Sequence, residues 1–255
     1  MSWAADISGM TVTLSPLPAG RTAHHVLSAQ AVEMAFQPVV ELYDGTVKAY
    51  EALARFDPHF TTPAHAFKAA SEAGIGVELE LLAIEQALLS LDHIPAGTWL
   101  STNLSAEALM NPVVINTLLA HADRGIGVEL TEHTQVHDYD ALVQVTNELR
   151  AAGVLIAVDD AGAGFASLSH ILQLRPDIIK LDITLTRGID TDPVRGALAR
   201  SLVSFADDIG AMLIAEGIET FAEHEKLRGL GVRLGQGFYM ASPGPLPTAQ
   251  VAIPA

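Results

Sequence analysis

Polar side chains interrupt the apolar segments of this chain at the points where predicted β-strands end. Along the sequence these side chains are Glu51, Asn103, Glu129 with Glu132, Asp159 with Asp160, Lys180, Glu216 with Glu219, and Gln236. In an α/β barrel the carboxyl ends of the strands meet at one rim, and active sites of this architecture lie there. We therefore expect six or more carboxylates to share one partly buried site.

Carboxylates gathered in a site of low dielectric constant need a cation, because each uncompensated ion is costly to bury. Oxygen ligands without Cys or His favour Mg²⁺ or Mn²⁺ over zinc. The adjacent carboxylates of Asp159 and Asp160 can bridge or flank two such ions, a common arrangement for activating water against a phosphate ester. Lys180 would then orient that water or neutralise phosphoryl charge, and Arg55 would contact a phosphate.

Each of these residues has a simpler interpretation when it is taken alone. An acidic residue at a strand end is more often the N-cap of the next helix than a metal ligand. Asn103 is equally well explained as a turn residue, and Lys180 as a solvated strand end. Coincidence at seven successive elements is much harder to accept, so the pattern as a whole favours a shared site.

The body of the chain alternates β-rich runs with helical patterns, which is typical of βα units and a mostly parallel sheet. The predicted strands are residues 35–40, 47–53, 98–102, 127–131, 154–158, 177–181, 212–215 and 233–236. Asp44-Gly45 is a hairpin turn signal, so the first two strands should be antiparallel. Because the strands are nearly continuous apolar runs, both of their faces should be buried, as in a closed barrel ringed by helices.

Helix signals fall between these strands. Apolar residues recur every three or four positions from Val77 to Leu91, which predicts an amphipathic helix. Two more helices are predicted over 138–150, closed by Gly153, and over 192–209, with Asp192 as N-cap and Pro193 at the first helical position. The long interval between Glu51 and Asn103 leaves room for an additional helix.

The length of 255 residues suits one barrel domain, which we place at 31–255. Residues 1–30 are rich in Ala, Ser, Thr, Pro and Gly, and they are interpreted as a lead-in or linker that ends in a short helix.

Composition narrows the function further. The chain has 14 Lys and Arg against 30 Asp and Glu, a net charge of −16, which disfavours extended nucleic-acid binding. The sequence contains no Cys, which excludes disulfides and thiolate sites and suits a reducing compartment. No secretory signal and no apolar run near the length of a membrane span is present, so we expect a soluble, cytoplasmic protein.

The motifs around these residues resemble a known family, the EAL-domain cyclic diguanylate phosphodiesterases. Glu51-Ala52-Leu53 with Arg55 matches the signature that names the family. The other matching segments are Gln37-Pro38-Val39-Val40, Asn103-Leu104-Ser105, Glu129-Leu130-Thr131-Glu132, Asp159-Asp160, Lys180-Leu181-Asp182, Ala215-Glu216-Gly217-Ile218-Glu219-Thr220 and Gln236-Gly237-Phe238. They occur in the family's order from about residue 34 to residue 245.

The resemblance implies a modified (β/α)8 barrel with an antiparallel first strand. It also implies hydrolysis of one phosphodiester bond of cyclic di-GMP to linear pGpG with two Mg²⁺ or Mn²⁺ ions, by a bacterial second-messenger enzyme that often forms a homodimer. The resemblance also implies a role for each matching residue. One metal would be held by Glu51, Asn103, Glu129 and Asp159, and the second by Asp159 and Asp160; Lys180 would bind the nucleophilic water, and Glu216 would be a ligand or general base. The substrate or the metal-bound water would lie near Gln37, Arg55 and Gln236, while Glu132 would anchor the loop after Asp160 and Glu219 would support the site.

The departures from the family pattern concentrate in that loop. Active members usually carry Phe, then Thr or Ala, then Tyr around two glycines, whereas this chain has Ala161, Ala163 and Phe165. Glu223 also stands where the family often has Gln. The altered loop supports a second hypothesis, a weak or inactive domain that acts as a cyclic di-GMP receptor, and a third hypothesis is a different metal-dependent barrel lyase or hydrolase.

Overall fold

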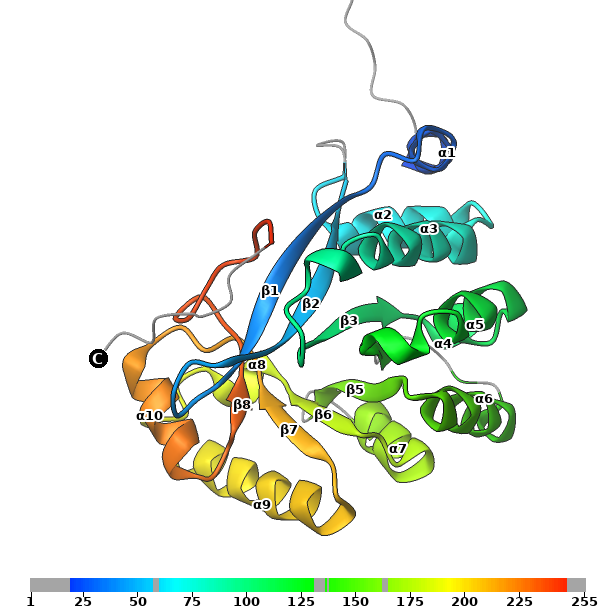
Figure 1. The fold of residues 1–255 in the computed structure, drawn as a ribbon. Coiled ribbons are helices and arrows are strands. Elements are labelled where there is room, and N and C mark those ends of the chain that lie inside the picture. The colour runs from blue at the N-terminus through cyan, green and yellow to red at the C-terminus, as the bar shows by residue number, and fades with distance from the viewer. Residues whose placement is uncertain (1–18, 57–59, 131–135, 137, 162–164, 247–255) are drawn as a thin grey trace, which may run out of the picture.

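The protein is a closed barrel of eight strands surrounded by helices (Figure 1). The computed structural model describes residues 19–56, 60–130, 136, 138–161 and 165–246. The strands are β1 (Glu33–Glu41), β2 (Val47–Arg55), β3 (Trp99–Leu104), β4 (Ile126–Leu130), β5 (Leu155–Ala161), β6 (Ile178–Leu181), β7 (Met212–Ala215) and β8 (Leu234–Gly235). β1 runs antiparallel to both β2 and β8, and every other neighbouring pair is parallel. The predicted modified TIM barrel with an antiparallel first strand is confirmed.

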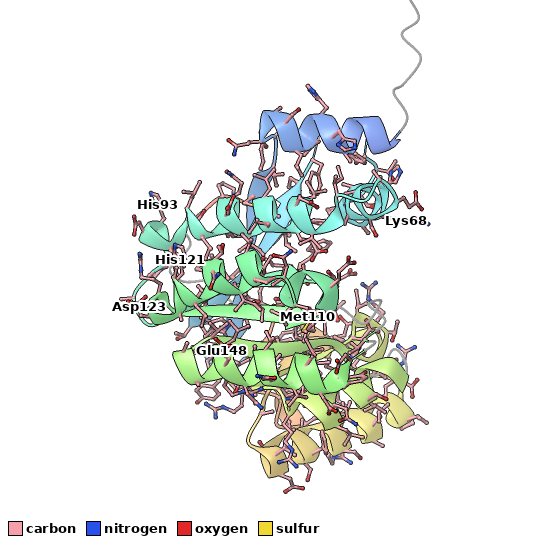
Figure 2. All side chains as sticks on the ribbon, turned by 90° about the vertical axis from the view of Figure 1, so that its right-hand side faces the viewer. Lys68, His93, Met110, His121, Asp123 and Glu148 are labelled. Atoms are coloured by element: carbon pink, nitrogen blue, oxygen red, sulfur yellow. The ribbon has the colours of Figure 1, made fainter. Side chains whose placement is uncertain are left out.

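Helices cover the outside of the barrel, as Figure 2 shows for one side of the molecule. They are α1 (Ala19–Ala29), α2 (Pro63–Glu72), α3 (Gly76–Leu88), α4 (Ala106–Leu109), α5 (Pro112–Leu119), α6 (Tyr139–Ala152), α7 (Phe165–Leu174), α8 (Ile183–Thr186), α9 (Pro193–Ile209) and α10 (Phe221–Gly229), with short 3-10 turns η1 (Leu91–His93) and η2 (Ala122–Arg124). Both α2 and α3 lie between β2 and β3, so the extra helix expected from the long interval after Glu51 is present.

Local sequence signals explain where the helices begin and end. The Asp192 carboxylate accepts hydrogen bonds from the backbone N–H groups of Val194 and Arg195, and Pro193 opens α9 as predicted. α6 runs two residues past the predicted end, to Ala152, and stops at Gly153. Gly153 has φ 107°, a left-handed conformation that favours glycine.

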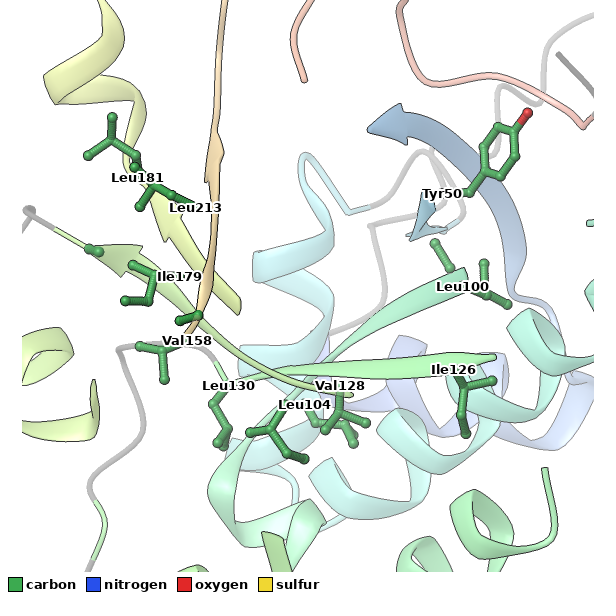
Figure 3. Close-up of a cluster of buried hydrophobic side chains, with 14 of the residues drawn as sticks. Tyr50, Leu100, Leu104, Ile126, Val128, Leu130, Val158, Ile179, Leu181 and Leu213 are labelled. Carbon is green, nitrogen blue, oxygen red and sulfur yellow. The ribbon is translucent and has the colours of Figure 1, made fainter. Parts of the chain in front are cut away.

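Alternation along the strands divides the core into two parts. The outward-facing side chains pack between the strands and the helices, as Figure 3 shows for Leu100, Val128, Ile179 and their neighbours. The inward-facing side chains form a separate cluster inside the barrel: Val39, Ala49, Ala157, Ile178, Ile214 and Leu234. The strands are therefore apolar on both faces, which accounts for their nearly continuous apolar sequence.

Four strands, β1, β2, β3 and β5, extend beyond their predicted ends, and two of these extensions concern the site. β3 continues to Leu104 and β5 continues to Ala161, so that Asn103, Asp159 and Asp160 lie within strands rather than after them. In β5 the pairing with β6 shifts between Val158 and Ala161, which is an irregularity that hydrophobic patterning does not reveal. These longer strands carry the polar residues to the rim on rigid backbone.

The N-terminal part of the described chain packs against the barrel's outer layer. Ala23 and Val26 of α1 are buried in one apolar cluster with residues of α2 and α3. The predicted short helix is therefore present, and the division into 1–30 and 31–255 stays a prediction. Among the described residues, no helix combines the length and the apolar character needed to cross a membrane.

Candidate active site

The candidate site lies inside the barrel at the carboxyl ends of the parallel strands. Five of its side chains stand two residues after a member of the inner apolar cluster. Ala49 is followed by Glu51, Ala157 by Asp159, Ile178 by Lys180, Ile214 by Glu216 and Leu234 by Gln236. Residues two positions apart on a strand point to the same face, so these polar side chains form a layer inside the barrel next to the apolar one.

Lys180 lies at the centre of this polar layer, with 1% of its surface exposed. Its Nζ is 2.7 Å from a Glu216 oxygen, 2.5 Å from a Glu129 oxygen, 3.2 Å from a Glu51 oxygen and 3.7 Å from an Asp159 oxygen. Four carboxylates from β2, β4, β5 and the end of β7 thus surround one ammonium group. Residues that are 165 positions apart in the chain, from Glu51 to Glu216, meet at one point.

Amide and hydroxyl donors complete the network. Asn103 Nδ2 donates to Glu51 Oε1 at 2.9 Å. Gln236 Nε2 donates to Glu51 Oε2 at 2.7 Å and to Glu216 Oε1 at 2.9 Å. The Ser101 hydroxyl donates to Glu129 Oε1. These donors hold the carboxylates in their positions around Lys180.

The pKa values of Lys180 and Glu51 are set by burial and by the attraction between their opposite charges. Burial opposes the charged form of Lys180, but Glu129, Glu216, Glu51 and Asp159 together raise the pKa of Lys180 well above its usual value. Burial likewise opposes ionisation of Glu51, yet Lys180 and the hydrogen bonds from Gln236 and Asn103 outweigh it and lower the pKa of Glu51. Both shifts favour an ion pair between a protonated Lys180 and an ionised Glu51.

One lysine does not balance the remaining carboxylates. Burial, with the neighbouring charge of Glu51, raises the pKa of Glu129 to about 8 despite the opposing effect of Lys180. Burial also raises the pKa of Glu216 well above its usual value, with Asp159 and Glu51 adding to the effect. The site holds more potential negative charge than its own cation neutralises, which is the condition expected of a site that takes up cations.

The donor set fits hard divalent cations. Carboxylate and amide groups from Glu51, Asn103, Glu129, Asp159 and Glu216 converge there, with no thiolate or imidazole among the described residues of the site. Such oxygen ligands suit Mg²⁺ and Mn²⁺. In the part of the chain that the structure describes, no three acidic or His side chains stand in an arrangement that holds a metal ion. The carboxylates are turned toward Lys180 Nζ instead, so metal binding would require their side chains to reorient.

The other predicted site residues that the structure describes take no part in this network. Gln37 is buried next to Glu51 across the β1–β2 pair, and its Nε2 donates to the carbonyl of Ala241 at 3.1 Å. Arg55 ends β2, and its guanidinium donates to the carbonyl of Ala54 at 3.0 Å. Glu219 pairs with Arg187. Glu132 lies outside the described residues, as does the side chain of Asp160.

Sequence reasoning gave no structural role to three polar residues that bond to the site's side chains or to the segments after its strands. Ser101 could have been found, because it lies two residues before Asn103 and so shares its inward face. Glu80 of α3 accepts hydrogen bonds from the Ser105 N–H at 2.7 Å and from the Ser105 hydroxyl at 2.8 Å. Glu223 of α10 accepts hydrogen bonds from three backbone N–H groups. No pattern in the sequence marks the contact of Glu80 with Ser105 or that of Glu223 with Gly188, because each joins two elements that are distant in the chain; the bonds of Glu223 to Glu219 and Thr220 belong to a capping box, which the Thr220-x-x-Glu223 spacing could have indicated.

The chain is similar in sequence to a known domain family and to named bacterial proteins. The family model described as EAL domain matches residues 21–243. The chain is 28% identical over 221 residues to a protein of Escherichia coli named probable cyclic di-GMP phosphodiesterase PdeG, a match that covers 82% of this chain and 44% of that protein. It is 30% identical over 232 residues to the bifunctional diguanylate cyclase/cyclic di-GMP phosphodiesterase MucR of Pseudomonas aeruginosa, covering 86% of this chain and 34% of that protein. The chain spans less than half the length of these two relatives.

Solved structures show the same fold. The calcium and cyclic di-GMP complex of Klebsiella pneumoniae BlrP1 superposes with a TM-score of 0.76 at 31% identity, covering 85% of this chain and 56% of that one. A manganese and cyclic di-GMP complex of BlrP1 superposes with a TM-score of 0.75 at 31% identity, covering 84% of this chain and 56% of that one. With a family model that covers most of its length, this chain belongs to the EAL domain family.

Proposed function

We propose that this protein hydrolyses one phosphodiester bond of cyclic di-GMP to linear pGpG, using two Mg²⁺ or Mn²⁺ ions. The observation that carries the proposal is the convergence of Glu51, Glu129, Asp159 and Glu216 around Lys180 at the barrel rim. The family assignment, the names of the relatives and the metal and cyclic di-GMP complexes of a homologue support the same reaction.

In this reaction some residues of the chain would bind the metal ions, and Lys180 would donate hydrogen bonds. Glu51, Asn103, Glu129 and Asp159 would hold one ion, and Asp159 with Asp160 would hold the other. When bound, the two ions would make water a better nucleophile at neutral pH and offset charge on the phosphoryl oxygens. Lys180 stays protonated, so it donates hydrogen bonds to the attacking water or to a phosphoryl oxygen and does not accept a proton.

The reaction balances without any further reactant. The water oxygen forms a bond to phosphorus, the bond from phosphorus to one ribose 3′ oxygen breaks, and that oxygen leaves as a hydroxyl after gaining a proton. Glu216, whose pKa is raised well above its usual value, is a carboxylate placed to hold a proton at this stage if it is not a ligand. Glu132 remains a predicted anchor of the loop after Asp160.

The net charge of −16 makes local cations necessary for an anionic substrate. Besides the divalent ions, Lys180 and Arg55 supply positive charge at the rim, and Gln37 and Gln236 supply amide groups for contacts to the substrate. We infer from the same charge that extended nucleic acid is not a partner. A homodimer and a cytoplasmic location remain predictions.

A cyclic di-GMP receptor without turnover is the second candidate. Ala161 favours it, because active members of the family usually carry Phe at this position. Ala161 is fully buried at the end of β5, and its carbonyl accepts the backbone N–H of Asp182, directly beside the segment that carries Lys180. A small side chain at this point supports the neighbouring loop less than a Phe ring would.

The experiment separates the two candidates by following bound and cleaved nucleotide in one sample. The full chain is incubated with cyclic di-GMP and Mn²⁺, and products are separated by chromatography, with Glu51→Gln and Glu148→Gln measured in parallel. Glu148 is exposed on the outer face of α6, so its variant controls for the loss of one negative charge (Figure 2).

We expect the wild type and Glu148→Gln to produce pGpG, and we expect Glu51→Gln to lose activity by a factor of about 100 or more, equivalent to about 2.7 kcal/mol or more of transition-state stabilisation. If cyclic di-GMP binds tightly to the wild type and stays intact, the protein is a receptor and the proposed phosphodiesterase activity is wrong. If cyclic di-GMP neither binds nor reacts, both candidates fail.

A further inference from the structure

Glu223 is a buried carboxylate that the proposed chemistry does not use. It lies in the first turn of α10, with 2% of its surface exposed. Its Oε1 accepts the backbone N–H of Gly188 at 2.9 Å, and its Oε2 accepts the N–H groups of Glu219 at 2.9 Å and Thr220 at 3.0 Å. Burial opposes its ionisation, but these backbone hydrogen bonds outweigh burial and lower the pKa of Glu223.

The two carboxylate oxygens have different tasks. Oε2 completes a capping box with Thr220, whose hydroxyl accepts the Glu223 N–H at 3.2 Å. A capping box works with Glu or Gln at this position, because it needs one acceptor oxygen. The bond from Gly188 needs a second acceptor oxygen, which only Glu provides. The structure thus gives a physical meaning to Glu223 at a position where the family often has Gln.

The Gly188 bond joins two segments that follow neighbouring strands. Gly188 lies after α8, in the connection that begins at β6 and Lys180, and Thr220 lies in the turn that follows β7 and Glu216. Arg187 and Glu219 form an ion pair alongside this bond. The two segments approach so closely that a Cβ on Gly217 would stand 2.3 Å from the Ile183 side chain.

Glu216 lies one residue past the end of β7, so the turn that follows it bears on its position more than it does for residues within strands. The pairing of β6 with β7 ends at Leu181 and Ala215, and the N–H of Glu216 makes the next hydrogen bond, to the Leu181 carbonyl at 3.0 Å. Beyond it, the turn from Gly217 to Thr220 is held in the middle by Ile218, whose N–H donates to the Gln236 carbonyl at 3.1 Å and whose carbonyl accepts the Tyr239 N–H at 3.0 Å. Glu223 fixes the far end of that turn to Gly188.

We infer that Glu223 is a positioning residue that locks the turn after Glu216 to the segment after Lys180, and so holds the Glu216 carboxylate in place for divalent-metal binding. The inference rests on the proposed function, because it assigns Glu223 a role in the site that would use the metal. The residue touches neither substrate nor metal.

The test uses Glu223→Gln in the full chain, because this variant keeps an acceptor oxygen for the capping box and replaces the acceptor of the Gly188 N–H with an amide NH2 group. Arg187→Gln, which removes the adjacent ion pair, is a second variant that leaves α10 unchanged. Glu148→Gln is the control for loss of one charge on an exposed helix. Binding of Mn²⁺ alone is measured by calorimetry, and cleavage of cyclic di-GMP is measured as a function of Mn²⁺ concentration.

We expect Glu223→Gln to weaken Mn²⁺ binding about tenfold, the lower end of the effect seen when groups that orient metal ligands are removed. The Mn²⁺ concentration for half-maximal rate should rise by a similar factor, while the KM for cyclic di-GMP and the thermal midpoint change little. Arg187→Gln should change Mn²⁺ binding in the same direction by a smaller factor, and Glu148→Gln should match the wild type.

Mn²⁺ affinity and turnover equal to wild type in folded Glu223→Gln would overturn the inference. If the wild type binds Mn²⁺ but does not cleave cyclic di-GMP, the proposed function fails, and the Mn²⁺ affinities of the variants still decide the role of Glu223. A wild type that binds no Mn²⁺ overturns both.

Discussion

At the scale of single residues, the site depends on Lys180. Its ammonium group is the shared partner of Glu51, Glu129, Asp159 and Glu216 in a buried layer. A buried cation that many anions share contributes by preventing their repulsion as well as by attracting each one. The same residue therefore serves stability and, in the proposed reaction, the phosphoryl group.

Lys180→Met should lower the free energy of unfolding by about 3–5 kcal/mol, because it leaves buried carboxylates without their partner. Urea unfolding at neutral pH measures the change. Lys68→Met is the matched control, since the Lys68 side chain is 75% exposed and its pair with Glu72 is 4.0 Å long. The control should change stability by less than about 0.5 kcal/mol. Equal, small effects for both variants would contradict the central place given to Lys180.

At the scale of elements, helices on the outside hold the ends of strands in place. Glu80 of α3 accepts two hydrogen bonds from Ser105, two residues after Asn103. Burial raises the pKa of Glu80 above its ordinary value of 4.5, against the opposing hydrogen bonds from Ser105 and with a contribution from Glu107. The folded protein therefore keeps the Glu80 proton at pH values where the unfolded chain has lost it.

Stability should follow that difference in pKa. The contribution of Glu80 is fully present below its unfolded pKa and is lost as pH rises through its higher folded pKa. Glu80→Gln cannot titrate, so its stability relative to the wild type should increase as pH rises from about 4 to about 7. Urea unfolding at several pH values measures this, with Glu85→Gln, exposed on the same helix, as the charge control. A difference that stays constant or falls with pH would exclude the predicted linkage.

A glycine beside the site is explained by the approach of two loops. A Cβ on Gly237 would stand 2.1 Å from the carbonyl oxygen and 2.3 Å from the backbone nitrogen of Ile218. Backbone atoms cannot move aside as a flexible side chain can, so the glycine of the Gln236-Gly237 motif is needed for packing.

Gly237→Ala should cost about 2–3 kcal/mol of unfolding free energy, as overpacking of a tight contact does. Gly229→Ala, in α10 with no atom within 4 Å of its added Cβ, is the matched control and should be neutral or slightly stabilising. Thermal unfolding of both variants checks the pair. If the two substitutions have the same effect, the close contact at Gly237 does not constrain the chain.

Much of this architecture could be predicted from the sequence, for physical reasons. Because side chains alternate along a strand, Glu51, Asp159 and Lys180 each share a strand face with the apolar residue two positions earlier. The parallel strands of a barrel end at one rim, so these side chains had to meet there. Hydrophobic patterning could not locate the end of β5, because its pairing with β6 is irregular there. The contacts of Glu80 with Ser105 and of Glu223 with Gly188 could not be predicted, because they join elements whose relative placement exists only after folding.

At the scale of the whole molecule, the fold concentrates negative charge where it can be used. A protein with a net charge of −16 gathers four carboxylates from four strands or strand ends at one rim. The raised pKa values of Glu129 and Glu216 indicate that this charge exceeds what Lys180 balances. Divalent cations would supply the balance and the chemistry together.

The most direct test of this account is the rate of pGpG formation from cyclic di-GMP with and without divalent ions. The purified chain is first treated with a chelator, and Mn²⁺ or Mg²⁺ is then restored in excess. We predict that cleavage stops in the chelator and returns when either ion is restored. Cleavage that continues without divalent ions, or a folded protein that forms no pGpG at saturating Mn²⁺, would contradict the account.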